Sequence, residues 1–352
     1  MVLYFTFSIA GMKYFEYQQP FKLETGGQLL QLTIAYQTYG TLNSAKNNVV
    51  WVCHALTANA LAEEWWPGFI GKDSAINSDE YFIVCANILG SCYGTTGPLS
   101  QNPDEGAPYY HGFPFITIRD MVRAHQLLFN HLQLQKIHLL IGGSMGGYQA
   151  LEWCCMEPQI IEHLFLIATS ARESAWGIAI HTAQRLAIEA DCSWKEKRES
   201  AGEKGLKTAR AIGMVTYRSF ASYAATQTEP DMNVVDDFKA SSYINYQGQK
   251  LVNRFNAFSY WTLTKAMDSH NIARGREETV DKVLQKLPQK TLIIGISSDI
   301  LCPASELEKM AEHMPNATYK EIDSLYGHDG FLIETKKISE VVLQWLKGKN
   351  DV

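Results

Sequence analysis

A short apolar run that ends in a glycine-rich pentapeptide does most to constrain the fold. The run Lys136–Gly143 (KIHLLIGG) leads into Gly142-Gly143-Ser144-Met145-Gly146, and the helix-forming stretch YQALEW follows. The pentapeptide fits G-x-S-x-G, in which a serine lies on a sharp turn between a strand and a helix. Such a turn strains the serine backbone, and side chains in place of Gly142 and Gly146 would collide with neighbouring backbone.

This setting predicts that Ser144 is a nucleophile. The strained turn lifts its Oγ above the end of the strand, at the N-terminus of a helix whose dipole favours developing negative charge. The alternative is a glycine-rich connection around a buried serine. The strand and helix patterns on either side favour the nucleophile.

Short apolar runs alternate with helical patterns along most of the chain. This alternation predicts an α/β fold with a mostly parallel sheet flanked by helices. A hairpin is expected earlier, over Phe21–Gly40, with its turn at Gly26–Gly27. The expected buried strands are Asn48–Cys53, Tyr81–Ile88, Lys136–Gly143, His163–Ser170 and Thr291–Ser298, and the expected helices are Thr117–Leu132, Gln149–Met156, Ser305–Met314 and Lys337–Lys347.

The alternation stops over about a hundred residues in the middle of the chain. Residues 171–276 are rich in Ala, Gln, Lys and Tyr and contain no clear core strand. A stretch of this length is too long for a simple crossover between strands. We therefore expect a helical cap at 171–276, inserted into a core formed by 1–170 and 277–352.

A serine hydroxyl needs a base that removes its proton, and on this fold the base is a histidine near the C-terminus. His328 lies in the glycine-flanked loop SLYGHDGF, after the strand-like run TYKEID. Of the other late histidines, His313 falls within a helical pattern just before a proline, and His270 precedes the last predicted core strands. His328 is the predicted base.

The base must in turn be oriented by an acid. Asp299 directly follows the strand Thr291–Ser298, at a strand end where active-site groups gather in open α/β sheets. Asp323 is the competitor, but it lies only five residues before His328. Asp329 adjoins His328, and we expect its side chain to point away from the imidazole towards the pocket. Asp299 is the predicted acid.

Two backbone N–H groups should stabilise the tetrahedral oxyanion. We expect one from Met145, directly after the nucleophile, and one from Leu56 in the loop after the strand Asn48–Cys53. His54 begins that loop, and its position favours a structural, hydrogen-bonded role. The residues alone thus predict serine acyl-enzyme chemistry on an α/β-hydrolase fold with a helical cap. Hydrolysis and acyl transfer both remain open, and a non-catalytic binding protein is the third alternative.

Composition narrows the class of protein. The chain has 352 residues, a net charge of −6 and seven cysteines. The sequence shows no basic stripe for nucleic acid, no metal-ligand spacing, and no apolar run of about 18 residues that would span a membrane. Met1–Ala10 is apolar but has no basic residue ahead of it, so a signal peptide is not indicated, and Met12 is an alternative start. We expect a cytoplasmic protein without a metal.

Six ordered blocks resemble one family, the homoserine O-acetyltransferases of methionine biosynthesis. Together they extend over nearly the whole chain from Phe21 to Glu334. The blocks are HALTAN (54–59), NILGSCYGTTGP (87–98), FPFITIRDMVRAHQ (113–126), IGGSMGGYQALEW (141–153), SYINYQGQKLVNRFNAFSYWTLTKAMD (242–268) and YGHDGFLIE (326–334).

The resemblance implies a ping-pong reaction in which Ser144 takes an acetyl group from acetyl-CoA and passes it to the hydroxyl of L-homoserine. It implies that Arg210 binds the substrate carboxylate, that Tyr217 lines the pocket and that Asp329 holds the substrate ammonium. Acetyl-CoA is then a co-substrate, with no cofactor, and a homodimer paired through the cap is expected.

The chain departs from the family pattern at two positions, because Met214 stands where His is usual and Tyr148 where Met is common. Met214 lies near the proposed carboxylate site, so details of how the acceptor is recognised can differ from those of the family. Related enzymes use succinyl-CoA, or serine as acceptor, with the same triad. These alternatives, and a serine esterase of the same fold, stay open at this point.

Overall fold

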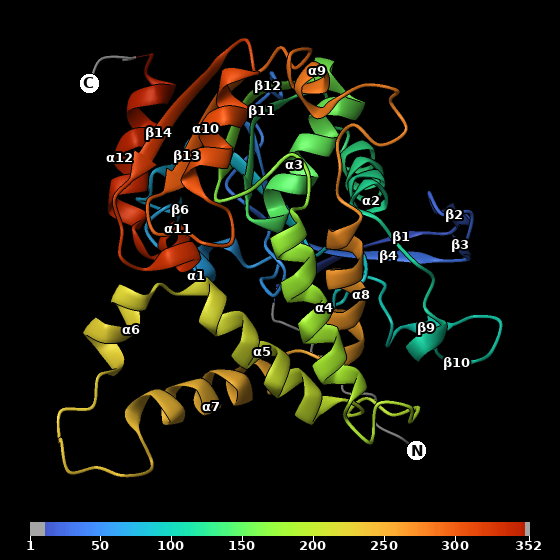
Figure 1. The fold of residues 1–352 in the computed structure, drawn as a ribbon. Coiled ribbons are helices and arrows are strands. Elements are labelled where there is room, and N and C mark those ends of the chain that lie inside the picture. Colours follow the sequence, from blue (N-terminus) through green and yellow to red (C-terminus); the bar gives the residue numbers. More distant parts are fainter. Residues whose placement is uncertain (1–10, 349–352) are drawn as a thin grey trace.

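A computed structural model describes residues 11–348 (Figure 1). Met1–Ala10, on which the choice of translation start depends, lies outside the described residues. The centre is an eight-stranded sheet in the order β1-β4-β8-β5-β11-β12-β13-β14, parallel from β8 to β14. Its strands are β1 (Lys13–Tyr17), β4 (Leu32–Tyr39), β5 (Val49–Cys53), β8 (Phe82–Ala86), β11 (Ile137–Gly143), β12 (Ile161–Ile167), β13 (Lys290–Ile296) and β14 (Ala317–Ile322). The predicted mostly parallel sheet is confirmed.

The central parallel strands are apolar over most of their length because helices cover both faces of the sheet. Every residue of β5 is buried, for example. The two hydrophobic clusters on the two faces draw on different helices. One includes residues of α2 (Ile118–His131), α3 (Met145–Met156), α9 (Val280–Leu284) and α10 (Ala304–Glu312); the other includes residues of α1 (Ala62–Trp65), α11 (Gly330–Ile333) and α12 (Thr335–Leu346).

The prediction of a hairpin over Phe21–Gly40 is wrong for its second strand, because the long strand there does not pair with the first. The glycine turn exists, but it joins only β2 (Phe21–Lys22) to β3 (Gln28–Leu29). The long strand β4 instead pairs antiparallel with β1 on one side and with β8 on the other. Two further short ladders lie in loops, β6 (Ile70–Gly71) with β7 (Ile76–Asn77) and β9 (Gln101–Asn102) with β10 (Ala107–Pro108).

Five helices lie within residues 171–276, which we call the cap. Serine or asparagine side chains cap the N-termini of three of them, because Ser174, Ser219 and Asn256 each accept a backbone N–H of the first turn. Figure 1 shows α6 and α7 projecting from the body of the molecule. The helices are α4 (Ala175–Glu189), α5 (Glu203–Tyr217), α6 (Phe220–Gln227), α7 (Lys239–Val252) and α8 (Ala257–Asp268).

A network of ion pairs joins the end of the cap to the core. The Glu152 carboxylate of α3 lies 2.7 Å from Arg119 Nε of α2 and 2.6 Å from Arg276 Nη2. Glu24, in the turn between β2 and β3, pairs with Arg119 and with Arg274. The chain is therefore fixed where it leaves the cap and returns to the sheet. Within residues 11–348, no helix is long and apolar enough to cross a membrane.

Candidate active site

The serine turn has the strain that the pentapeptide predicts. Ser144 has φ 53° and ψ −128°, a conformation that costs a non-glycine residue free energy. A Cβ at Gly142 would lie 2.4 Å from the Gly146 carbonyl oxygen, and one at Gly146 would lie 2.0 Å from the Cys53 carbonyl oxygen. Both positions thus require glycine. The close approach of Gly146 also brings the end of β5 against the first turn of α3.

The structure brings Ser144, His328 and Asp299 together in one hydrogen-bonded chain. His328 Nε2 lies 2.9 Å from Ser144 Oγ, and His328 Nδ1 lies 2.7 Å from Asp299 Oδ2. Ser144 follows β11, Asp299 follows β13, and His328 lies in a 3₁₀ turn after β14. All three loops leave the carboxyl ends of parallel strands, which is why residues so far apart in sequence meet at one edge of the sheet.

Backbone contacts hold Asp299 in the orientation that the imidazole needs. Its Oδ1 accepts hydrogen bonds from the N–H groups of Leu301 and Cys302 at 2.8 and 2.9 Å, which leaves Oδ2 for His328. The alternative acid, Asp323, is not the partner of His328. It is exposed, and its Oδ1 accepts a hydrogen bond from Ser297 Oγ at 3.2 Å.

The charges around His328 favour its protonated form. Burial acts to lower the pKa of the imidazole, but the charge of Asp299 and the hydrogen bond to it, with smaller contributions from Asp329 and Glu173, together raise that pKa above its ordinary value. A raised pKa suits a base that must hold the serine proton after attack.

We expect kcat/KM for acetyl-CoA to fall on the acid side, because protonated His328 cannot accept the Ser144 proton. The pKa is raised, so the inflection should lie above the ordinary value of about 6.5. Initial rates across the pH range, with circular dichroism at each pH as a control for unfolding, measure this. An inflection at or below the ordinary value would contradict the assigned surroundings of His328.

The two expected oxyanion donors border the same turn. Met145 is the first residue of α3, so its N–H has no acceptor within the helix. Leu56 is buried in the loop after β5, whose end touches Gly146. The neighbouring His54 is fully buried, with Nδ1 2.8 Å from the Ala55 carbonyl oxygen and Nε2 accepting the Ile88 N–H at 3.1 Å.

Helix α5 carries two of the three cap and loop residues expected to bind substrate, Arg210 in its middle and Tyr217 at its last position. The Tyr217 ring centroid lies 5.9 Å from that of His328, and the Arg210 guanidinium lies 5.4 Å from the Tyr217 ring. Close packing at Gly327 makes this possible, because a Cβ there would lie 2.9 Å from the Tyr217 carbonyl oxygen. Asp329 forms an ion pair with Arg218, with Oδ2 2.8 Å from Nε.

Comparison with known proteins identifies the family. The family model for the α/β hydrolase fold matches residues 48–335. A homoserine O-acetyltransferase of Cyclobacterium marinum is 48% identical over 325 residues, covering 92% of each chain. The chain belongs to the homoserine O-acetyltransferase family. A solved homoserine O-acetyltransferase from Bacillus anthracis superposes with a TM-score of 0.87 at 25% identity, covering 95% of this chain and 97% of that one. The esterase E22 shares the fold, with a TM-score of 0.86 at 23% identity over 95% and 99% of the two chains.

The buried carboxyl group of Glu173, which lies near the triad, was not predicted from the sequence. Glu173 accepts the Tyr148 hydroxyl at 2.9 Å and the Ser174 N–H at 2.9 Å, and the Tyr148 ring stacks on that of His270. Burial raises the pKa of the Glu173 carboxyl. Glu173 comes soon after the end of β12, and that position at a strand's carboxyl end is the sequence signal that could have singled it out.

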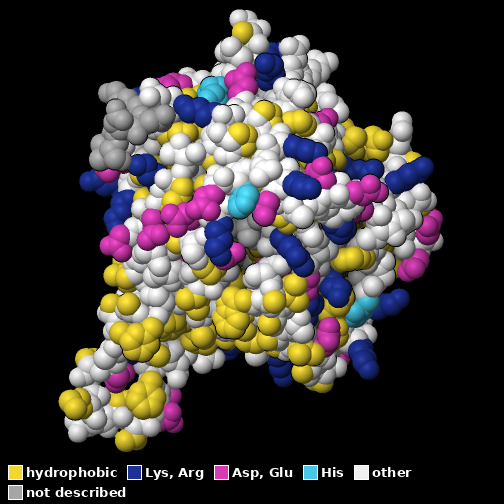
Figure 2. Space-filling view, turned by 45° about the horizontal axis from the view of Figure 1, so that its top comes forward, with side chains coloured by type: hydrophobic (Ala, Val, Ile, Leu, Met, Phe, Trp, Pro, Cys, Tyr) yellow, Lys and Arg dark blue, Asp and Glu magenta, His cyan; other side chains and the backbone are white. Residues whose placement is uncertain are grey.

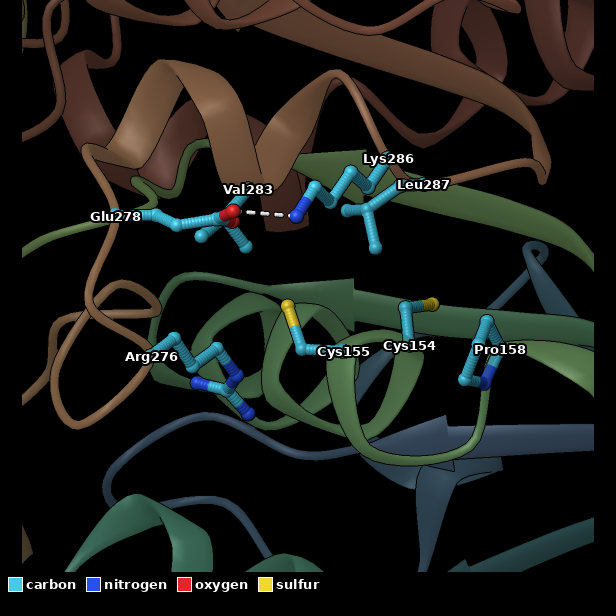
Figure 3. Close-up of a pocket in the computed structure, with 8 residues that line it drawn as sticks. All are labelled: Cys154, Cys155, Pro158, Arg276, Glu278, Val283, Lys286 and Leu287. Carbon is cyan, nitrogen blue, oxygen red and sulfur yellow. Dashed lines mark hydrogen bonds and ion pairs between the residues drawn. The ribbon is translucent and has the colours of Figure 1, made fainter.

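A cavity of about 400 Å³ lies away from the triad of this family member (Figure 3). Cys154 and Cys155, near the C-terminal end of α3, line it, whereas Ser144 precedes the N-terminal end. Its charged groups are already paired, Lys286 with Glu278 and Arg276 with Glu152. Burial raises the pKa of Cys155 to about 12, so its thiol stays neutral and packs as an apolar group. The triad, and not this cavity, is the candidate active site.

Proposed function

We propose that this protein transfers the acetyl group of acetyl-CoA to the hydroxyl of L-homoserine through an acetyl–Ser144 intermediate. The observation that carries the proposal is the hydrogen-bonded chain Ser144–His328–Asp299 in a member of the homoserine O-acetyltransferase family. The product would serve methionine biosynthesis.

In the first half-reaction, Ser144 Oγ attacks the thioester carbonyl while His328 takes its proton. Asp299 keeps the proton of His328 on Nδ1, so that Nε2 is free to accept, and it stabilises the imidazolium. The N–H groups of Met145 and Leu56 would stabilise the oxyanion. The tetrahedral intermediate collapses to acetyl–Ser144, and the CoA thiolate leaves with the proton from His328.

In the second half-reaction, the homoserine hydroxyl gives its proton to His328 and attacks the acetyl–serine carbonyl. Collapse restores Ser144 with the proton from His328 and releases O-acetylhomoserine. Both half-reactions use the same base and the same oxyanion site. We propose that they need no metal and no cofactor beyond acetyl-CoA as co-substrate, because proton transfer and acyl transfer account for every step.

Arg210 and Asp329 are suited to the two charges of the homoserine backbone. Arg210 Nε is buried without a hydrogen-bond partner among the described residues, a state that a substrate carboxylate would relieve. The Tyr217 ring lies close to both the Arg210 guanidinium (5.4 Å) and the His328 ring (5.9 Å), and would form one wall of the pocket. Asp329 would bind the substrate ammonium while it remains ion-paired with Arg218.

Arg210→Lys should raise KM for homoserine about 10- to 100-fold, because a lysine cannot reproduce the bidentate, charge-assisted hydrogen bonds. The rate of CoA release in the first half-reaction should not change. Steady-state kinetics with homoserine and a stopped-flow burst with acetyl-CoA separate the two. Lys204→Ala, which removes an exposed cation from the same helix, is the control. An unchanged KM would remove Arg210 from the acceptor site.

A thiol-release assay tests the proposed activity against its alternatives. The protein is incubated with acetyl-CoA or succinyl-CoA, each with homoserine, with serine or without acceptor. Sustained release from acetyl-CoA only with homoserine supports the proposal. Equal release without an acceptor would favour an esterase-like hydrolase, the class that shares the fold. Faster turnover with succinyl-CoA or with serine would reassign the donor or the acceptor, and no release in any arm would contradict transferase activity.

The cap is also the surface through which we propose that two copies pair. Figure 2 shows hydrophobic side chains on the projecting lobe. In and between α6 and α7, Phe220, Met232 and Val235 are at least 90% exposed, and Tyr246 is 61% exposed. A monomer rarely exposes such a group of apolar side chains without a partner.

Phe220→Glu with Val235→Glu should therefore convert a dimer to a monomer, because the charges would be buried against apolar surface. Sedimentation velocity measures the change. Tyr14→Glu, on the edge strand β1, is the control and should leave the dimer intact. A wild-type monomer, or a double variant that stays dimeric, would contradict pairing through this lobe.

We infer a cytoplasmic location. All seven cysteines are free, and four of them are buried, namely Cys53, Cys85, Cys154 and Cys302. Free thiols in this number fit a reducing compartment better than an oxidising one.

A further inference from the structure

Three metal-ligating side chains meet at the end of the sheet opposite the triad. His138 lies near the start of β11, and Glu162 and His163 lie near the start of the neighbouring strand β12. Ser144 follows the other end of β11, so about 20 Å of strand separates the two places. The cluster thus has no part in the acyl-transfer site.

The spacing of the ligand atoms fits a small divalent cation. His138 Nδ1 lies 3.1 Å from Glu162 Oε2, and one ligand atom from each of the three residues lies within 4.8 Å of the others. Two ligands of a tetrahedral zinc ion, each about 2.1 Å from the metal, lie about 3.4 Å apart. The 3.1 Å between His138 and Glu162 is close to that separation, and the ligand atom of His163, within 4.8 Å of both, would move inward to bind.

Neighbouring groups orient the rings of His138 and His163 for metal binding. His163 Nδ1 lies 3.0 Å from the His138 carbonyl oxygen, so it donates its proton there and leaves the Nε2 lone pair free. Metal-binding histidines are commonly oriented in this way by a carbonyl group. The His163 ring also packs edge-on against Trp345, and Tyr81 stacks on His138.

We propose that His138, Glu162 and His163 bind a divalent transition metal, with Zn²⁺ the best fit to two imidazoles and one carboxylate. Water would complete a tetrahedral site. The competing explanation is a salt bridge of Glu162 with His138 and with Lys136, whose Nζ lies 3.6 Å from Glu162 Oε1. That salt bridge does not involve His163, whereas the metal site uses it as a third ligand, with one of its ring nitrogens within 4.8 Å of the other two ligand atoms. Lys136 is 56% exposed and can turn into solvent when a cation binds.

Titration of the tag-free, chelator-treated full-length protein with ZnCl₂ in a calorimeter tests the proposal. One equivalent should bind, and His163→Ala and Glu162→Gln should each weaken it at least tenfold. Glu162 is 36% exposed and the substitution keeps its shape, so Glu162→Gln should fold normally. Absorption bands of tetrahedral Co²⁺ should appear in the wild type and be lost in both variants. Acetyl transfer without added metal should be unchanged in both.

Two control variants make the outcome specific. His313→Ala removes a partly exposed histidine that lies near the carboxylate of Asp281 and outside the proposed site, and should bind zinc like the wild type. His328→Ala breaks the other group of possible ligands, Asp299, Cys302 and His328 of the triad, and should also retain binding. Loss of binding in both His163→Ala and Glu162→Gln, with retention in both controls, supports the site. Any other pattern, or no binding by the wild type up to about 1 mM Zn²⁺, overturns it.

Discussion

Ser144→Ala should lower kcat for acetyl transfer by roughly a million-fold. The triad acts as a unit, so removal of the nucleophile alone costs about as much as removal of all three members. The His328 imidazole would remain paired with Asp299 but would have no hydroxyl to deprotonate. Any residual rate would come from binding and the oxyanion donors alone.

The fold of this variant should be unchanged, because alanine needs no more space than serine at a position whose φ is already 53°. Thiol release, and the thermal midpoint of unfolding, measure the two effects separately. Ser259→Ala is the matched control, since Ser259 is a buried serine of α8 whose hydroxyl has no hydrogen-bond partner among residues 11–348. A Ser144→Ala enzyme within tenfold of the wild type would remove Ser144 from the reaction.

Asp299→Asn should lower kcat about 10,000-fold while preserving the geometry of the site. The asparagine oxygen can still accept the N–H groups of Leu301 and Cys302. Its NH₂ group would then face His328 Nδ1 and donate a hydrogen bond to it. The imidazole would be held with its own proton on Nε2, in the tautomer that cannot accept the proton of Ser144.

Asp323→Asn provides the control, because Asp323, five residues before His328 in the chain, is the acid that competed with Asp299 in the sequence analysis. It is exposed and bonded to Ser297, so its neutralisation should leave kcat within about twofold of the wild type. Turnover measured for both variants decides between the two acids. A large loss in Asp323→Asn with retained activity in Asp299→Asn would reverse the assignment.

Local signals predicted the parallel sheet and the meeting place of the triad. A buried parallel strand is apolar over most of its length, and β5, β11 and β13 could be recognised from that feature. Once those strands were aligned in parallel, their carboxyl ends had to share one edge, so loops carrying Ser144 and Asp299 were expected together. The glycine requirement at Gly142 and Gly146 followed from the sharpness of one turn.

Pairings between distant segments could not be predicted in the same way. On one side β4 pairs with β1, and nothing local in β4 distinguishes β1 from β3 as the neighbour on that side. The ion pair of Asp329 with Arg218 joins the cap to the core, so it depends on how α5 packs against the His328 loop. The ligand spacing of His138 with Glu162 arises from the register of two strands 24 residues apart in sequence, and a search for short metal motifs does not detect it.

The acetyl–enzyme intermediate provides the most direct test of the proposed mechanism. The protein is mixed with acetyl-CoA in the absence of homoserine, quenched in acid, and its intact mass and peptide masses are measured. We expect one added acetyl group, on the peptide that contains Ser144, and its loss with formation of O-acetylhomoserine when homoserine is added before the quench. Release of CoA only when both substrates are present, with no acetylated protein at any time, would contradict the acyl-serine relay.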